Sequence, residues 1–259
     1  MDPRRVALRL DHASVAVPDL AVAVEHLDRR LGLRASVTPQ APERHGRVYL
    51  DRSYLEVAAG SAETGWEVTL FFLRFDDPEA LRAHLDDGGI AYRFGEYEGV
   101  DGTWDDVEIR LGTVPLPTLI RRTAPEVVAR DWPPALAETH RCGARTLTAV
   151  HVEVPSLDEA VDAYRRLLGA EQVPWLDNER QARGQASVRP ATGEIVLHQG
   201  GSSGIIGIVL GVPSLAATRT ALEGRLGWMD EKVAWLDPDE TFGLRLGFAE
   251  LEAHPRPGV

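Results

Sequence analysis

Histidine and carboxylate side chains are the groups in this sequence with the widest chemical scope. His12 lies in LRLDHASVAV, His45 in PERHGR and Glu56 in SYLEVAAG. Neutral imidazole and carboxylate are ligands that suit Zn²⁺, Fe²⁺, Mn²⁺ or Ni²⁺. Three such ligands leave positions open for water or substrate oxygens, where a metal polarises a carbonyl, stabilises an enediolate or activates water. The sequence therefore offers donors for a divalent-metal site.

Taken singly, each of these side chains also has a simpler explanation. An isolated histidine in a strand, such as His12, is usually hydrogen-bonded to its neighbours. Glu56 lies between Leu55 and Val57, and either parity of that strand can face inward. His45 can belong to a loop instead of a strand. The positions alone leave both explanations open.

Other kinds of chemistry find little support. The chain has 28 Lys and Arg against 40 Asp and Glu, and this acidic balance opposes a nucleic-acid or membrane-surface partner. There is no Gly-x-Ser-x-Gly elbow, Cys/His zinc cluster or phosphate-binding loop. The single Cys142 cannot form an internal disulfide, which favours a reducing compartment. Without an apolar run typical of a signal peptide or a membrane span, a cytoplasmic protein is expected.

A repeat organises the elements that must position these side chains. VPDLAVAVEHLDRRLG begins at Val17, and the similar segment VPSLDEAVDAYRRLLG begins at Val154. A second VPSL begins at Val212, and the step from Val154 to Val212, applied to Val17, reaches Phe75 in FDDPEALRAHLDDGG. Internal repeats indicate recurring structural units. We therefore predict four similar units arranged as two pairs.

Each unit is predicted to contain a strand, a proline-containing turn, a helix and further strands. In the first unit, the helix begins after Asp19 and ends at Gly32. The predicted strands are 8–17, 45–52, 53–60, 66–75, 104–112, 115–123, 145–154, 185–190, 194–200, 203–211 and 242–250. The other predicted helices are 78–89, 158–169 and 214–227.

Units of this kind used in pairs resemble the vicinal oxygen chelate fold. LDHASVAVPDLAVAVEHLDRRLG and HGRVYLDRSYLEV are similar to segments of glyoxalase-like proteins, and FDDPEALRAHLDDGGI and LPTLIRR also fit that family. The resemblance is best over 8–122 and weaker over 146–250. It implies an α+β fold of four βαβββ-type modules, paired into two halves with cup-shaped mixed sheets. The implied boundaries are 1–125 and 146–252 for the halves, 126–145 for a linker and 253–259 for a tail.

The resemblance also implies a divalent metal inside the cup. Its ligands would be His12 on the first strand and Glu56 on the last strand of the first unit, together with His45. Glu56 is also the candidate catalytic residue. Tyr49 and Arg122 are candidates for substrate binding, since a guanidinium can bind a carboxylate or phosphate. A solvated strand end is the simpler explanation for Arg122.

The second half departs from the family pattern. The position of the repeat that corresponds to His12 is Ala149, so no ligand is carried over. His151 and His198 each lie two positions beyond the places where ligands are expected. They form either a second, degenerate site or unrelated strand residues, and the latter is the simpler explanation. The remaining histidines are expected at the surface: His26, His84, His140 and His254.

Three functions are compatible with this reasoning. The leading hypothesis is a metal-dependent, glyoxalase-like isomerase or lyase that acts on a small oxygenated metabolite. A rival is a metal-free binding protein, like the antibiotic-binding (bleomycin-resistance) members of the superfamily. A third is an iron-dependent extradiol-type dioxygenase, because two histidines and one carboxylate suit Fe²⁺. In each case the partner is a small molecule, and the protein is a monomer or a homodimer.

Overall fold

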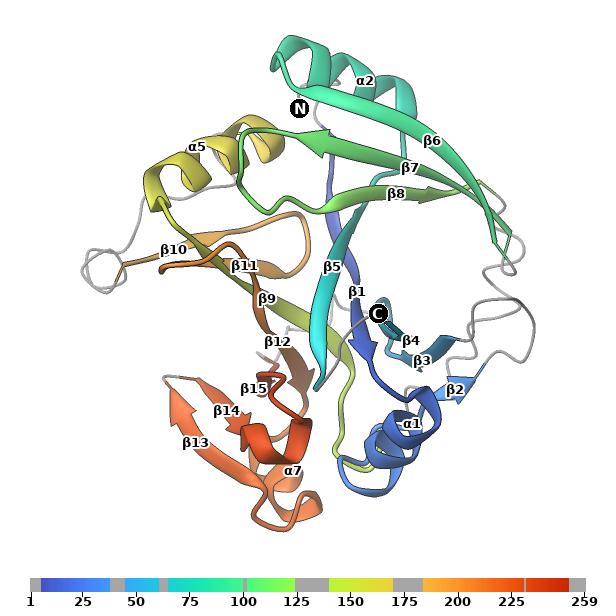
Figure 1. The fold of residues 1–259 in the computed structure, drawn as a ribbon, viewed down its shortest axis with the longest axis vertical. Helices are drawn as coiled ribbons and strands as arrows, with labels where there is room; N and C mark the ends of the chain where they lie inside the picture. The colour runs from blue at the N-terminus through green and yellow to red at the C-terminus, as the bar shows by residue number, and fades with distance from the viewer. Residues whose placement is uncertain are drawn as a thin grey trace, which may run out of the picture.

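Two mixed β-sheets, one from each half of the chain, form the framework of the protein (Figure 1). The computed structural model describes residues 6–37, 45–60, 65–99, 102–123, 140–169, 184–230 and 232–251. Within these ranges, the N-terminal sheet has the strand order β2-β3-β4-β1-β5-β8-β7-β6, and the C-terminal sheet the order β10-β11-β9-β12-β15-β14-β13. The strands of the N-terminal sheet are β1 (Arg9–Val17), β2 (Ser36–Val37), β3 (His45–Tyr49), β4 (Tyr54–Ala59), β5 (Glu67–Arg74), β6 (Ala91–Gly99), β7 (Gly102–Arg110) and β8 (Thr118–Arg122). Those of the C-terminal sheet are β9 (Thr146–Val154), β10 (Gln185–Val188), β11 (Glu194–Gln199), β12 (Gly204–Val212), β13 (Leu226–Asp230), β14 (Val233–Leu236) and β15 (Leu246–Glu250). The helices are α1 (Leu20–Arg29), α2 (Pro78–Asp87), α5 (Leu157–Leu168), α7 (Leu215–Ala221) and the 3₁₀ helix η2 (Pro238–Thr241).

Each half consists of two modules in which the first strand pairs in parallel with the last. These parallel pairs are β1–β4, β5–β8, β9–β11 and β12–β15. The antiparallel pairs β1–β5 and β9–β12 join the two modules of each half. The predicted fold of four βαβββ-type modules in two halves is confirmed. The domain boundaries stay a prediction, because most of the linker and the whole tail 253–259 lie outside the described residues.

The repeated sequence segments mark the turn from a strand to a capped helix. The Asp19 side chain accepts hydrogen bonds from the first turn of α1, and Asp77 does the same for α2. Ser156 and Ser214 hold the corresponding positions before α5 and α7. Such a side chain satisfies backbone N–H groups that a first helical turn leaves unpaired. None of the described helices is long and apolar enough to cross a membrane.

Gly32 turns the chain shortly after α1, which itself ends at Arg29. Its φ of +64° is left-handed, and a Cβ added there would lie 3.0 Å from the Cβ of Arg141 and from the backbone nitrogen of Cys142. Gly32→Ala is therefore expected to lower the free energy of unfolding by about 1–2 kcal/mol. Urea denaturation measures this change. Gly201→Ala, where an added Cβ meets nothing within 4 Å, is the matched control. Equal midpoints for the two variants would contradict the prediction.

The sequence pattern does not predict β2, β6, β13 or β14, and it makes one helix too long. The helix predicted over 214–227 ends at Ala221. Glu223 and Gly224 have φ values of +51° and +81°, which stop the helix and redirect the chain into β13. The helical periodicity of this segment is thus overridden by the turn that follows it.

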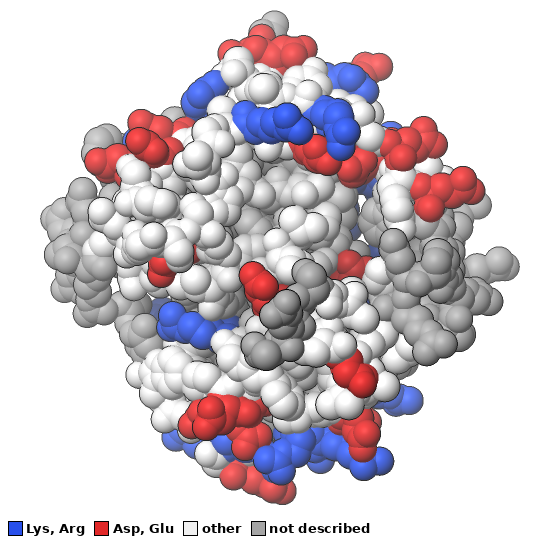
Figure 2. Space-filling view, in the orientation of Figure 1, with Lys and Arg blue, Asp and Glu red and all other residues white. Residues whose placement is uncertain are grey.

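One apolar core is shared by the two halves. A single cluster of buried side chains includes Phe71 and Leu73 of the N-terminal sheet and Val150 and Val152 of the C-terminal sheet. Main-chain contacts also join the halves, since the N–H of Asp51 donates to the carbonyl of Arg145 at 2.6 Å. Figure 2 shows charged side chains gathered at two opposite ends of the viewed face, with few in the middle.

His140 lies at the contact between the halves, and the prediction that it lies at the surface is wrong. Only 6% of it is exposed. The backbone N–H of Arg34 donates to its Nδ1 at 3.0 Å, and its Nε2 contacts the carbonyl oxygen of Tyr49 at 2.7 Å. The ring is buried because it satisfies two backbone groups of the N-terminal half. His26 and His84 are half-buried, and His254 lies outside the described residues.

Candidate functional site

A β-bulge in β1 brings two neighbouring side chains to the same face of the N-terminal sheet. The pairing of β1 with β5 runs from Leu10 opposite Leu73 directly to His12 opposite Phe72, so that Asp11 is the extra residue. In a regular strand, Asp11 and His12 would point to opposite faces. Here Nδ1 of His12 lies 2.9 Å from Oδ2 of Asp11, and both residues are buried. Because a carboxylate only accepts hydrogen bonds, Nδ1–H of His12 donates to Asp11.

Two aromatic rings hold the imidazole of His12 in place. The ring of Tyr54 stacks on it at a centroid distance of 4.1 Å, and the ring of Phe72 stacks at 3.9 Å. Burial, and then the charges of Asp11 and Glu56, raise the pKa of Tyr54 well above its ordinary value. Tyr54 therefore keeps its proton at neutral pH. The stack and the Asp11 hydrogen bond together fix the orientation of the His12 ring.

Glu56 lies on the same face of the sheet as His12. Leu55 and Val57 are each 2% exposed and belong to the core, which settles the parity of β4. The hydroxyl of Ser14 donates to Oε2 of Glu56 at 2.9 Å. Oε1 of Glu56 lies 3.7 Å from Nδ1 of His45. We call this surface the polar face of the N-terminal sheet; it carries His12, Ser14, His45, Arg47, Tyr54 and Glu56.

The structure brings together His45 and Glu56 of the predicted metal ligands, with His12 as a diagonal neighbour. In the pairing of β1 with β4, Ser14 lies opposite Glu56 and His12 lies opposite Tyr54. His12 is therefore diagonal to Glu56 and two residues away along the strand direction. Among the residues that the structure describes, no three His, Cys, Asp or Glu side chains are grouped so as to hold a metal ion.

The predicted substrate-binding residues flank this face at two places. The rings of Tyr49 and Tyr54 lie 6.5 Å apart. The guanidinium of Arg122 lies 4.2 Å over the ring of Trp104. Its positive charge acts on Tyr54 in the direction that lowers the pKa of the phenol. The neighbouring Arg121 instead donates to Asp105 at 2.8 Å.

Sequence reasoning missed Ser14, Arg47 and Tyr54 of this face. It also missed Asp11 and Phe72, which contact the His12 ring. One signal was available for Ser14, because it lies two residues after His12 on the same strand and so shares its face. Arg47 also alternates with His45, and its guanidinium lies 3.8 Å from Glu56. The position of Asp11 depends on the bulge, which no residue of the segment predicts.

Comparison with known proteins gives a family for this arrangement. Residues 10–168, more than half of the chain, match the model of the glyoxalase-like domain. The chain belongs to this family. The predicted membership of the glyoxalase-like protein in the vicinal oxygen chelate superfamily is thereby confirmed. The sequence has no match among curated proteins.

Solved structures share the fold of this glyoxalase-like protein at low sequence identity. The Mn(II)-bound glyoxalase from Novosphingobium aromaticivorans is 12% identical over 95% of this chain and 83% of that chain, with a TM-score of 0.67. The 2,3-dioxygenase LapB from Pseudomonas sp. KL28 is 14% identical over 98% and 96%, with a TM-score of 0.66. A hypothetical protein from Staphylococcus aureus is 10% identical over 94% and 99%, with a TM-score of 0.65. The likeness extends over both halves.

The C-terminal half of the glyoxalase-like protein has a different set of groups at the corresponding place. His151 holds the position in β9 that Ser14 holds in β1, and Val196 pairs with it as Glu56 pairs with Ser14. The two histidines of this half do meet, with Nδ1 of His151 at 2.8 Å from Nε2 of His198. This half therefore has an imidazole pair without the carboxylate.

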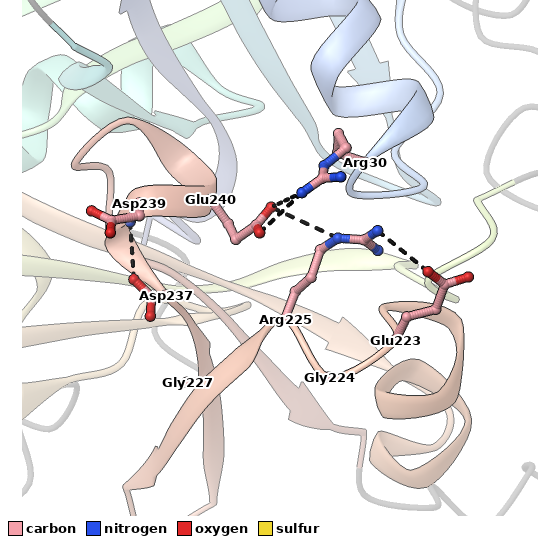
Figure 3. Close-up of a pocket in the computed structure, with 8 residues that line it drawn as sticks. All are labelled: Arg30, Glu223, Gly224, Arg225, Gly227, Asp237, Asp239 and Glu240. Carbon is pink, nitrogen blue, oxygen red and sulfur yellow. Dashed lines mark hydrogen bonds and ion pairs between the residues drawn. The ribbon is translucent and has the colours of Figure 1, made fainter.

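A charged cavity of about 520 Å³ lies where α1 meets the last module (Figure 3). Arg30 contacts both carboxylate oxygens of Glu240 at 3.1 Å, and Arg225 lies 3.7 Å from the same carboxylate. Its lining includes none of the predicted site residues. Both arginines are already paired with the Glu240 carboxylate, and the Arg30–Glu240 pair joins the N-terminal half to the C-terminal half.

Proposed function

We propose that this glyoxalase-like protein is a divalent-metal-dependent enzyme that acts on a small oxygenated metabolite at the polar face of the N-terminal sheet. The observation that carries the proposal is the Asp11–His12 pair next to the His45–Glu56 pair. A metal-binding histidine commonly donates one ring N–H to a carboxylate, which leaves the other nitrogen for the metal. His12 has this arrangement through its 2.9 Å contact with Asp11. The donor chemistry therefore fits Zn²⁺, Fe²⁺, Mn²⁺ or Ni²⁺, with His12, His45 and Glu56 as ligands.

The residues of this face have distinct roles in isomerase- or lyase-type chemistry. A bound cation would act as a Lewis acid toward vicinal substrate oxygens, and it would also stabilise the negative charge that develops on them. Glu56 is the candidate proton acceptor, and the hydroxyl of Ser14 orients its carboxylate. Tyr54 covers one side of the His12 ring and excludes water from it. Tyr49 and Arg122 are the candidates for contact with the substrate.

Metal content of the purified protein tests this proposal. We expect about one divalent metal per chain in the wild type after preparation without chelators, measured by plasma mass spectrometry. His12→Ala and Glu56→Ala should lose it, because each removes a ligand. Glu67→Ala, an exposed carboxylate at the start of β5, is the matched control and should keep it. A wild type without metal after reconstitution, or full metal in both ligand variants, would refute the proposal.

A second candidate function is metal-free binding of a small molecule for sequestration. Two observations favour it: no three-donor group is found among the described side chains, and Glu56 is already engaged by Ser14. Ligand binding that survives EDTA, with the ligand recovered unchanged, would support this function over the enzyme. Ligand turnover that stops in EDTA would exclude it.

A further inference from the structure

An arginine without a carboxylate partner among the described residues lies on the C-terminal sheet, on the face that carries His151. Arg245 shares this face with Gly247, and Gly247 pairs with Trp235. The guanidinium of Arg245 lies 5.0 Å over the ring of Trp235 and 5.9 Å from that of Trp228. Within the described ranges, it forms no ion pair, although it is half-buried. A partly desolvated guanidinium favours an anionic partner.

Trp235 presents a second donor at the same place. The residue is 1% exposed, and its Nε1 has no hydrogen-bond acceptor among the described residues. Its ring lies so close to Gly247 that a Cβ there would be 2.8 Å from it. Two glycines, Gly207 and Gly247, thus make room for the indole. A buried N–H without an acceptor is costly, so the site favours a molecule that brings an acceptor.

The imidazole pair adjoins Trp235. The ring of His151 meets the ring of Trp235 edge to face, at a centroid distance of 5.1 Å. Its Nδ1 shares a hydrogen bond with His198, and the side chain of Gln185 lies 3.3 Å from the other nitrogen of His198. The imidazole pair thus extends the row of polar groups on this face beyond Trp235.

Two carboxylates on this face, those of Glu153 and Glu194, are engaged elsewhere. Glu153 accepts a hydrogen bond from the backbone of Ser202 at 2.9 Å, and Glu194 accepts one from Ser187. Hydrogen bonds from Ser202 lower the pKa of Glu153, which keeps it ionised and tied to that loop. Both carboxylates therefore leave Arg245 available to an anion from outside the protein.

We propose that this face of the C-terminal sheet binds a small aromatic carboxylate. Arg245 pairs with the carboxylate, and the indole N–H of Trp235 is its second donor. Trp228, which is 40% exposed, offers a flat surface for the ring of the ligand. The site is separate from the polar face of the N-terminal sheet, and it requires no metal.

Calorimetric titration of the intact protein with benzoate, in EDTA, tests this site. We expect binding to weaken about 10- to 100-fold in Arg245→Gln and about 3- to 10-fold in Trp235→Phe, which removes the N–H but keeps a ring. Arg219→Gln on α7 is the control and should bind as the wild type does. Benzamide, which lacks the charge, should bind far more weakly than benzoate. Circular dichroism and thermal unfolding verify that each variant is folded.

Several results would overturn the site. Benzoate that does not bind the wild type at millimolar concentration would do so, as would benzamide that binds equally well. Unchanged affinity in a folded Arg245→Gln would have the same meaning. Loss of binding in Arg122→Gln, with Arg245→Gln unaffected, would place the ligand on the N-terminal sheet instead.

Discussion

Asp11→Ala is expected to weaken divalent-metal binding about 10- to 100-fold, although Asp11 is not itself a predicted ligand. The carboxylate accepts the Nδ1–H of His12 at 2.9 Å. It thereby fixes the tautomer in which the proton is on Nδ1, and it makes Nε2 a stronger ligand. Without Asp11 the buried ring keeps its aromatic neighbours but loses the group that selects this tautomer. Titration with Mn²⁺, followed by electron paramagnetic resonance, measures the affinity.

The matched control for this experiment is Asp76→Ala. Asp76 is an exposed carboxylate that pairs with Arg9 and lies 3.9 Å from Arg74, so it shares an arginine with Asp11 without touching His12. Its replacement should leave the affinity unchanged. Asp11→Asn, which keeps an acceptor oxygen, should lie between Asp11→Ala and the wild type. Equal affinities for Asp11→Ala and Asp76→Ala would show that Asp11 has no part in metal binding.

His140→Ala is expected to lower the free energy of unfolding by about 2–4 kcal/mol at pH 7.5. The change leaves the N–H of Arg34 and the carbonyl of Tyr49 without their partner at the contact between the halves. Because Nδ1 accepts a hydrogen bond, the folded protein holds His140 as the neutral Nε2–H tautomer. Burial, the largest cause, and the charges of Arg145 and Arg34 lower the pKa of this imidazole below 6.5. Urea denaturation of the wild type and the variant measures the difference.

The effect of His140 should also depend on pH. When the pH falls below 6.5, the unfolded chain takes up a proton at this residue before the folded chain does. The stability that His140 contributes is therefore complete above that pH and decreases as the pH falls toward the lower folded pKa. The difference in free energy of unfolding between the wild type and His140→Ala should decrease as the pH is lowered from about 7 to about 5. A constant gap over that range would contradict the tautomer assignment. His84→Ala, a half-buried histidine with one carbonyl contact, is the comparison variant.

Much of the fold follows from local sequence, because a similar strand-to-helix turn precedes each of the four α-helices. Asp19 and Ser156 follow a proline, and each caps a helix at the predicted place. The strands that escape prediction lack that signature. β6 is a half-exposed, charged strand, and β13 comes after a turn that only the positive φ angles of Glu223 and Gly224 reveal.

The candidate site is predictable only in part, and the reason is register. The parity of β4 could not be chosen from Leu55, Glu56 and Val57 alone, because either set can face a core. Packing against the shared core makes that choice. The bulge that places Asp11 next to His12 arises from the pairing of β1 with β5, which is a property of two segments and not of either one. Whether His12, His45 and Glu56 bind a metal stays a prediction.

The shared core has a consequence for the stability of the two halves. Phe71 and Val150 belong to the same buried cluster, so the apolar surface of each half is covered in part by the other. We therefore expect the two halves to unfold as one cooperative unit, so that a destabilising substitution in either half lowers the stability of both. Val196 stands in β11 where the N-terminal half has Glu56 in β4, so the C-terminal half lacks this carboxylate and still supplies part of the core on which the N-terminal half depends.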